Sequence, residues 1–413
     1  MTPPSFWFWL MPYGGDRQHA KYQHVLVALA EGLVARGAVV RANVDYWPLH
    51  ARNSSGNVLF RRTEAAPETF DVVATSWLRL YHIDNLKRPA KLHPVFAPRH
   101  GSTGSSRRPF RVLIDWKYGQ PDRAYWQRSL THFDIIYRSH FSHSNVPAEA
   151  VRTGRIQVGG FHWTARMRSA LDVARRQAEP WSERSRTLLW AHSGAALTHT
   201  VRRRAQPLGE QLAAAAGLRL QSGSRLGVAP RARADDFRRS PEYLREEAFW
   251  LNHTGGRHSL GYYAQLVSSM ACDAGGGYFF PCQRFGDVAG TDATSAGGLR
   301  RGPRARRTCI YQWESFKLAE MMLAGCAVFM PDLERYQLRF AVMPTPFIDY
   351  VPYVLEQEEL QTLLKWLASG ELDLQRIGRN GQRWAETHFS PLAFADRLLA
   401  DVRKLTARKM DQA

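Results

Sequence analysis

One carboxylate in a helix-to-strand segment is the first candidate for ligand chemistry in this sequence. Residues 311–332 read YQWESFKLAEMMLAGCAVFMPD, an amphipathic helix that turns at Gly325 into a short apolar strand. Glu320 lies on the helix, five residues before that glycine. Helices of this kind border the sheet edge at which α/β enzymes bind nucleotides. The segment therefore predicts a nucleotide site, and the alternative is an ordinary exposed glutamate.

Two other features of the second half have the chemistry to hold a phosphate. Lys317 precedes Glu320 by one helical turn, and a cation there can neutralise a diphosphate. Ser193 and Gly194 end a strand and open a helix, where free backbone N–H groups bind phosphate. The alternatives are a solvated lysine and a helix that Ser193 simply caps.

Three further candidate positions lie in the first half: a turn, a strand end and a loop. Gly14, Gly15 and Asp16 form the turn after the first strand, where glycine lets the backbone approach a ligand. Asp115, in LIDWKYG, and His143, in RSHFSHSN, are candidates for a catalytic base by position. Ordinary turn, strand-end and loop residues are the alternatives.

Alternating strands and helices must position these side chains. Strand, glycine turn, helix and strand near the start form a βαβ unit, which predicts a parallel sheet with a right-handed crossover. Strands are expected at residues 6–11, 38–44, 71–76, 111–115, 134–137, 187–191, 218–221, 278–281 and 326–330. Helices are expected at residues 19–35, 163–178, 208–216, 261–270, 358–367 and 373–404, with a break near 388–391.

These elements divide into two α/β halves. We expect a first domain at residues 1–178, a linker at 179–186 and a second domain at 187–388, followed by a C-terminal helix at 389–413. Residues 283–307 are poor in apolar side chains and rich in Gly and Arg, so we interpret them as an insertion or a disordered loop. Two such domains would face each other across a cleft, where ligands bind at the carboxyl ends of the strands.

Composition limits the classes of partner. The chain of 413 residues carries 56 Lys and Arg against 37 Asp and Glu, a net charge of +19, which suits an anionic partner. Arginine enrichment of the whole genome would give the same excess. The densest run, LRRGPRARR at 299–307, permits nucleic-acid binding, but no known module and no regular aromatic interleaving accompany it, so we do not expect that partner.

Cysteine spacing and hydropathy complete these limits. The four cysteines show no C-x-x-C spacing, so neither a metal site nor a disulfide framework is predicted. No apolar run has the length of a membrane span, and the first residues lack the pattern of a signal peptide. We therefore expect a cytoplasmic protein.

Three segments resemble the nucleotide-sugar glycosyltransferases of the GT-B type. They are the opening MPYGGDRQHAKYQHVLVALAEGLVARGAVV, the donor-side segment WESFKLAEMMLAGCAVFMPD and the closing helices IGRNGQRWAETHFSPLAFADRLL. FIDYVPY followed by EELQTLLKWL also resembles the Cap-like protein O-glucosyltransferases. The resemblance implies a GT-B-like fold of two Rossmann-like doubly wound domains. It also implies a hexosyltransferase that moves a sugar from a nucleotide diphosphate donor to an unidentified acceptor, with no metal or other cofactor.

The resemblance also implies roles for individual residues. Glu320 matches the second carboxylate of the family's Glu-x7-Glu pattern, which holds the donor ribose, and a carboxylate is apt for a diol. The first carboxylate falls at Gln312, and the nearest acid is Glu314. Because of this departure, the resemblance does not identify the donor sugar. A non-catalytic or epimerase-type relative is therefore the alternative. The donor side then comprises Glu320, Lys317, Ser193, Gly194, Gly325 and Glu314, and the acceptor side Gly14, Gly15 and Asp16. Retaining members of the family need no base of their own.

Overall fold

The structure is a computed structural model of the whole chain. It describes residues 4–11, 23–50, 57–76, 92–97, 108–116, 123–139, 141–142, 146–176, 178–190, 200–222, 241–254, 258–274, 279–282, 307–310, 316–354 and 357–411.

The first half folds around an eight-stranded sheet with the order β3-β4-β2-β1-β5-β6-β7-β9. All neighbouring strands are parallel except β3, which is antiparallel to β4 at the edge. The strand order runs outward from β1 in both directions, which is the doubly wound arrangement. The strands are β1 (Phe6–Trp9), β2 (Val40–Ala42), β3 (Tyr46–Pro48), β4 (Val58–Arg62), β5 (Val72–Ser76), β6 (Phe110–Asp115), β7 (Ile135–Arg138) and β9 (Ile156–Val158).

Helices cover both faces of this sheet because its strands are apolar on both sides. Along β1, Phe6 and Phe8 enter one core cluster while Trp7 and Trp9 enter the other, as the alternation of a strand requires. One face carries α1 (His24–Ala35) and the other carries α3 (Arg123–His132) and α4 (Ala148–Arg152).

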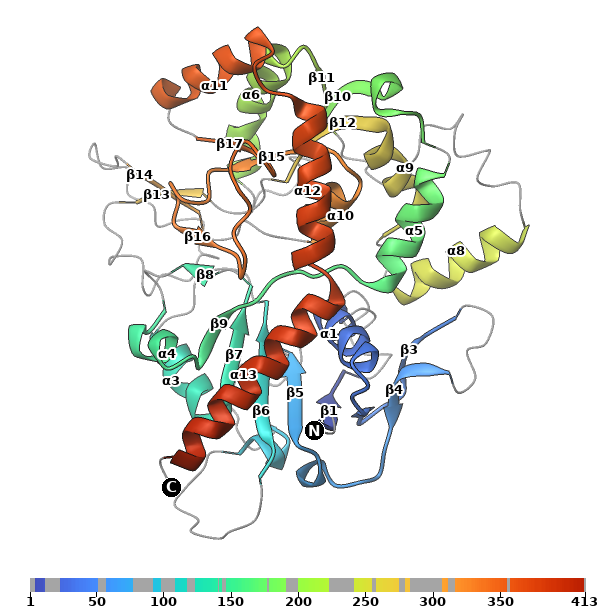
Figure 1. The fold of residues 1–413 in the computed structure, drawn as a ribbon, viewed down its shortest axis with the longest axis vertical. Coiled ribbons are helices and arrows are strands. Elements are labelled where there is room, and N and C mark those ends of the chain that lie inside the picture. Colours follow the sequence, from blue (N-terminus) through green and yellow to red (C-terminus); the bar gives the residue numbers. More distant parts are fainter. Residues whose placement is uncertain are drawn as a thin grey trace.

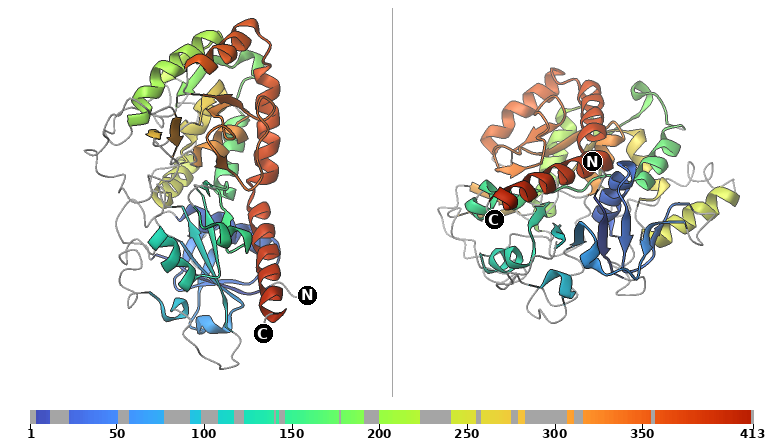
Figure 2. Two further views of the ribbon diagram at one scale, coloured as in Figure 1. Left: turned by 90° about the vertical axis from the view of Figure 1, so that its left-hand side faces the viewer. Right: turned by 60° about the horizontal axis from the view of Figure 1, so that its bottom comes forward.

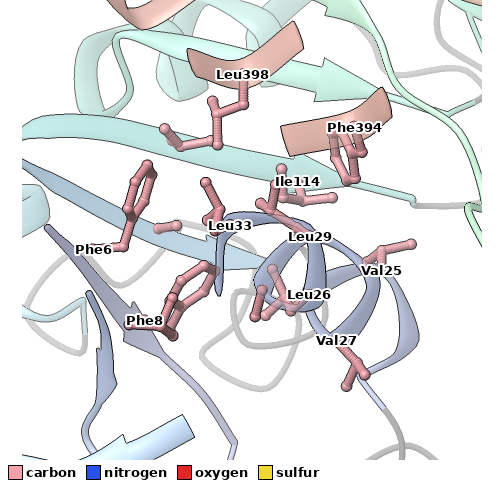
Figure 3. Packing of buried hydrophobic residues seen from close by; sticks show 14 of the residues in the cluster. Phe6, Phe8, Val25, Leu26, Val27, Leu29, Leu33, Ile114, Phe394 and Leu398 are labelled. Carbon is pink, nitrogen blue, oxygen red and sulfur yellow. The ribbon is translucent and has the colours of Figure 1, made fainter. Parts of the chain in front are cut away.

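The last helix of the chain returns to this first sheet. α13 (Pro391–Asp411) packs along α1, and Phe394 and Leu398 join the cluster of Phe6 and Phe8 (Figure 3). Gly32 makes the close approach of the two helices possible, because a Cβ at this position would lie 2.0 Å from the carbonyl oxygen of Pro391.

The second half folds around a five-stranded parallel sheet with the order β11-β10-β12-β15-β17 (Figure 1). This order also reverses at the first strand, so both halves are doubly wound and the predicted fold class is confirmed. The strands are β10 (Ser185–Trp190), β11 (Arg219–Ser222), β12 (Ser269–Asp273), β15 (Ala327–Pro331) and β17 (Val351–Tyr353). The helices are α5 (Ala165–Arg175), α6 (Thr200–Ala215), α9 (Leu260–Ser268), α10 (Phe316–Leu323), α11 (Gln357–Ser369) and α12 (Leu374–His388). α8 (Pro241–His253) belongs to this half of the chain but places Trp250 in the core of the first domain.

The division of the chain between the two domains differs from our expectation. α5, which we expected in the first domain, places Met167 and Leu171 in the core of the second domain with Leu266 of α9. The chain therefore passes between the domains before α5, and the expected linker at 179–186 already contains the start of β10. The sequence correctly predicted a helix in this segment, but a helical pattern does not reveal which sheet the helix will cover.

Three other differences concern short elements. The expected helix at 261–270 ends at Ser268, and β12 begins at the next residue. β13 (Phe279–Cys282) and β14 (Arg307–Ile310) form an antiparallel pair, so Arg307 belongs to a strand, while 283–306 lie outside the described residues. β8 (Phe141–Ser142) pairs with β16 (Leu338–Arg339), which links the domains.

Helices α12 and α13 run along one side of both domains (Figure 2). Where they meet, Trp163 donates hydrogen bonds from its backbone and indole nitrogens to the carbonyl oxygens of Phe389 and Ala385, both at 3.1 Å. These bonds hold the chain segment that precedes α5 against the junction of the two last helices. Among the described helices, none combines the length and the apolar character that crossing a membrane requires.

Candidate functional site

The carboxyl edges of the two sheets face each other. In a parallel α/β domain each helix runs against the strands, so helix N-termini lie at the carboxyl edge of the sheet. His24 opens α1 in the first domain, and His258 stands just before α9 in the second. The centroids of their imidazole rings are 5.8 Å apart. The two edges therefore meet at these histidines.

Glu320 lies at this meeting point and is buried. It sits on the second turn of α10 with 2% of its surface exposed. Its Oε1 accepts a hydrogen bond from the hydroxyl of Tyr263 at 2.7 Å and pairs with Nδ1 of His258. A carboxylate is stable in an apolar interior only with such partners, so the alternative of an ordinary exposed glutamate is wrong.

Tyr262 adds a second phenol beside Glu320. Burial raises the pKa of the Tyr262 hydroxyl well above its usual value, and the charge of Glu320 raises it further. The hydrogen bonds from His258 and Tyr263 end on Oε1 of Glu320. His258, Tyr262 and Tyr263 therefore all lie at the carboxylate of Glu320.

His258 holds its ring in this place with an uncommon backbone conformation. Its φ angle is 58°, in the left-handed region that residues other than glycine rarely adopt. The next residue, Ser259, caps α9 by accepting a hydrogen bond from the backbone nitrogen of Tyr262 at 3.2 Å. The left-handed residue thus turns the chain directly into a capped helix.

On the first-domain side of the site, His24 contacts a third histidine, His162. Nε2 of His24 pairs with the carbonyl oxygen of His162, so this nitrogen carries the proton. Nε2 of His162 accepts a hydrogen bond from Nη2 of Arg397 at 2.6 Å, and its ring stacks on Phe394 at 4.3 Å. Burial and the charge of Arg397 hold the pKa of His162 well below its usual range. His162 is therefore neutral and serves as a fixed anchor.

Gln23 ties the start of α1 to the end of β1. Its side-chain amide accepts from the backbone nitrogen of Met11 at 3.1 Å and donates to the carbonyl oxygen of Met11 at 3.2 Å. Its backbone nitrogen donates to the hydroxyl of Tyr46 at 2.9 Å. These bonds fix the position of His24 at the carboxyl edge of the first sheet.

Asp115 lies at the end of β6 but is closed off from the site. Its Oδ2 forms an ion pair with Nη1 of Arg138 at 2.8 Å, and both side chains are 0% exposed. The hydroxyl of Tyr125 donates to the same oxygen at 2.7 Å, and burial followed by the charge of Asp115 raises the pKa of Tyr125 well above its usual value. In this state Asp115 joins β6, β7 and α3, and it presents no surface to a substrate.

Lys317 and Gly325, the other predicted residues of the helix-to-strand segment that the structure describes, lie toward opposite ends of α10. Lys317 lies on the first turn of α10, half-buried and one turn from Glu320. Gly325 has a φ angle of 74° and ends the helix through a hydrogen bond from its nitrogen to the carbonyl oxygen of Met322 at 2.9 Å. Its carbonyl oxygen lies against Gly378 of α12, at the opposite end of α10 from the histidines. Gly325 is therefore a turn residue that does not join Glu320.

The other candidates lie outside the described residues. They are Gly14, Gly15, Asp16, His143, Ser193, Gly194, Gln312 and Glu314. Sequence reasoning missed His258 and Tyr263, which the fold brings to Glu320, and His24, which it brings to His258. A signal for two of them existed, because Ser259 followed by an apolar run is typical of a helix start, and polar groups near such a start can reach a ligand.

Comparison with known proteins finds remote similarities among solved structures. No protein-family model matches the chain, and no curated protein matches it by sequence. Among solved structures, the chain is similar to AviGT4, a glycosyltransferase involved in avilamycin A biosynthesis, with 13% identity, 98% of both chains covered and a TM-score of 0.45. It is also similar to Phytolacca americana UGT2 complexed with UDP-2-fluoro-glucose and pterostilbene, with 11% identity, 98% and 94% of the chains covered and a TM-score of 0.30.

Proposed function

We propose that this protein is a glycosyltransferase that moves a sugar from a nucleotide diphosphate donor to an acceptor. The observation that carries the proposal is the place of Glu320, a buried carboxylate at the carboxyl edge of the second sheet, opposite the carboxyl edge of the first. Ligands of doubly wound proteins bind at this edge. The segment that contains Glu320 is also the one that resembles the donor-binding part of GT-B enzymes.

In this proposal the second domain holds the donor. Oε2 of Glu320 accepts a ribose hydroxyl while Tyr263 and His258 hold Oε1. Lys317 and the N-terminal end of α10 lie one turn away, where positive charge and helix N–H groups favour the diphosphate. The proposal also assigns Ser193, Gly194 and Glu314 to the binding of the donor, and Gly14, Gly15 and Asp16 to that of the acceptor.

The chemistry in this proposal is electrostatic. Stabilising the departing diphosphate lowers the barrier to breaking its bond to the anomeric carbon of the sugar, while the acceptor oxygen bonds to that carbon. Closure of two domains around the donor excludes water. Of the two base candidates the proposal keeps His143, because Asp115 is held in a closed ion pair. A retaining reaction would use neither residue.

Isothermal titration with a panel of nucleoside diphosphates tests the proposal. We expect one of them to bind, and Glu320→Gln to weaken its binding by roughly tenfold or more, since a hydrogen bond to a charged group is replaced by a weaker one. Glu386→Gln is the matched control, because Glu386 pairs with Arg168 in the same domain and away from the site. Hydrolysis of a panel of nucleotide sugars would then identify the donor.

Two results would exclude this function. One is the absence of binding to every nucleoside diphosphate tested. The other is an affinity for the Glu320→Gln protein equal to that of the unaltered protein. Melting temperatures of both variants separate a loss of binding from a loss of folded protein.

A further inference from the structure

His258 and Glu320 form a buried pair although 62 positions of the chain separate them. The imidazole Nδ1 of His258 and the hydroxyl of Tyr263 reach the same carboxylate oxygen, Oε1, from the start of α9. Two donors on one oxygen fix the rotation of the carboxylate. The carboxylate is thus held in one orientation, with Tyr262 beside it.

We propose that His258 is a positioning residue that orients Glu320 so that its Oε2 receives a ribose hydroxyl of the donor. This inference rests on the proposed function, because it requires a ribonucleotide at this site. His258 itself would not touch the nucleotide. It acts through the orientation of the carboxylate and thereby through the recognition of ribose.

The backbone of His258 supports this role. A residue with a Cβ is strained at a φ angle of 58°, and glycine would take that angle without strain. Two glycines stand close by in the sequence, Gly255 and Gly256, yet the left-handed position is occupied by a histidine. Strain of this kind persists where the side chain has a task that the surrounding structure enforces.

The first domain also holds His258 in place. The ring of His24 lies 5.8 Å from the ring of His258 with an interplanar angle of 34°, and His24 is bound in turn to the carbonyl oxygen of His162. The orientation of Glu320 therefore depends on a contact that exists only when the two domains stand in this relative position. Recognition of ribose in the second domain is in this way linked to the first domain.

Substitutions at position 258 can separate the donated hydrogen bond from the backbone conformation. His258→Gly keeps the left-handed backbone and removes the donor. His258→Asn also tolerates this backbone, and its amide nitrogen can donate from nearly the place of Nδ1. Tyr263→Phe removes the other donor at Oε1. Tyr137→Phe is the matched control, because Tyr137 donates to a carboxylate, Asp401, at 2.6 Å in the first domain.

The measurement is the ratio of affinities for a nucleoside diphosphate and for its 2′-deoxy and 3′-deoxy analogues. We expect the unaltered protein to prefer the ribonucleotide by roughly tenfold or more over at least one analogue. His258→Gly should bring this preference close to unity and leave the affinity for that analogue unchanged. His258→Asn should retain most of the preference, Tyr263→Phe should reduce it, and Tyr137→Phe should retain all of it.

Several results would overturn the inference. If His258→Gly keeps the preference for the ribonucleotide, the hydrogen bond from His258 does not orient the carboxylate. Should the glycine variant not fold, an unchanged preference in Tyr263→Phe shows the same for the donors at Oε1. Equal losses in His258→Gly and His258→Asn show that the donated hydrogen bond is not the cause. Binding without any preference in the unaltered protein removes the inference and leaves the proposed function standing. Failure to bind any nucleotide removes both.

Discussion

Removing the carboxylate of Asp115 should destabilise the first domain, because it takes away the carboxylate that forms an ion pair with a buried guanidinium. Asp115 and Arg138 are both 0% exposed and 2.8 Å apart. Breaking such a pair by truncating one partner costs about 3–5 kcal/mol of the free energy of unfolding. For a domain of roughly 200 residues each kcal/mol lowers the melting temperature by about 2–4 °C, so Asp115→Ala should melt on the order of 10 °C below the unaltered protein.

The assay is differential scanning calorimetry combined with transfer activity per folded protein. Two controls sharpen it. Asp396→Ala removes an exposed ion pair with Arg36, whose side chains are 49% and 44% exposed, and should change the free energy of unfolding far less than Asp115→Ala does. The double variant Asp115→Leu with Arg138→Met replaces the buried pair by apolar groups and should melt close to the unaltered protein.

The result that would refute this reasoning is a variant that is stable but inactive. If Asp115→Ala melts within about 2 °C of the unaltered protein and still abolishes transfer, the carboxylate acts in the reaction and the buried pair is not its role. A loss of stability with normal activity in the remaining folded protein would confirm the structural role.

Two further substitutions test particular positions. Gly325→Ala should lower the free energy of unfolding by about 1–2 kcal/mol, because the φ angle is 74° and a Cβ would lie 3.1 Å from Oε1 of Gln382. Nucleotide affinity per folded protein should not change, and a weaker affinity at normal stability would place Gly325 in the site. Burial raises the pKa of Glu31 from 4.5 to about 8, against the hydrogen bond that its Oε2 accepts from the backbone nitrogen of Ala165. The folded state therefore favours the neutral acid, and its contribution to stability is complete below pH 4.5 and lost as the pH rises through about 8. Glu31→Gln stays neutral, so urea denaturation should show its stability rising relative to the unaltered protein across this range, and a constant difference would contradict the shifted pKa.

Apolar runs with clear ends predicted most of the two sheets. β1, β6 and β10 lie within one or two residues of the expected strands at their starts because each contains an apolar run, FWFW, VLI and LLW respectively. β12 was missed for the opposite reason. The sequence LGYYAQLVSSMACD continues from α9 into β12 with no glycine or proline between them, so the helical pattern hides the strand.

The candidate site could be predicted only in part. The helix and the turn at Gly325 follow from local pattern, and so does the position of Glu320 on the helix. The contact of Glu320 with His258 does not, because it depends on how α9 and α10 pack side by side against the sheet. The contact between His258 and His24 depends in addition on the approach of two domains, which no local pattern encodes.

Several energetically unfavourable features lie together where the domains meet, and their coincidence argues for a ligand. Glu320 carries a carboxylate into the interior, His258 adopts a left-handed backbone, and His162 is buried beside Arg397. Apolar residues of similar volume would fill the same space with equal or greater stability, so folding alone does not call for these groups. Locally unfavourable choices of this kind are concentrated in proteins at functional sites and are compensated elsewhere in the fold.

Asp115 and Arg138 are the contrast within the same molecule, because their buried pair has ordinary backbone geometry and bonds three elements of one domain together. Glu320 is therefore the buried carboxylate at which a change should alter binding more than stability.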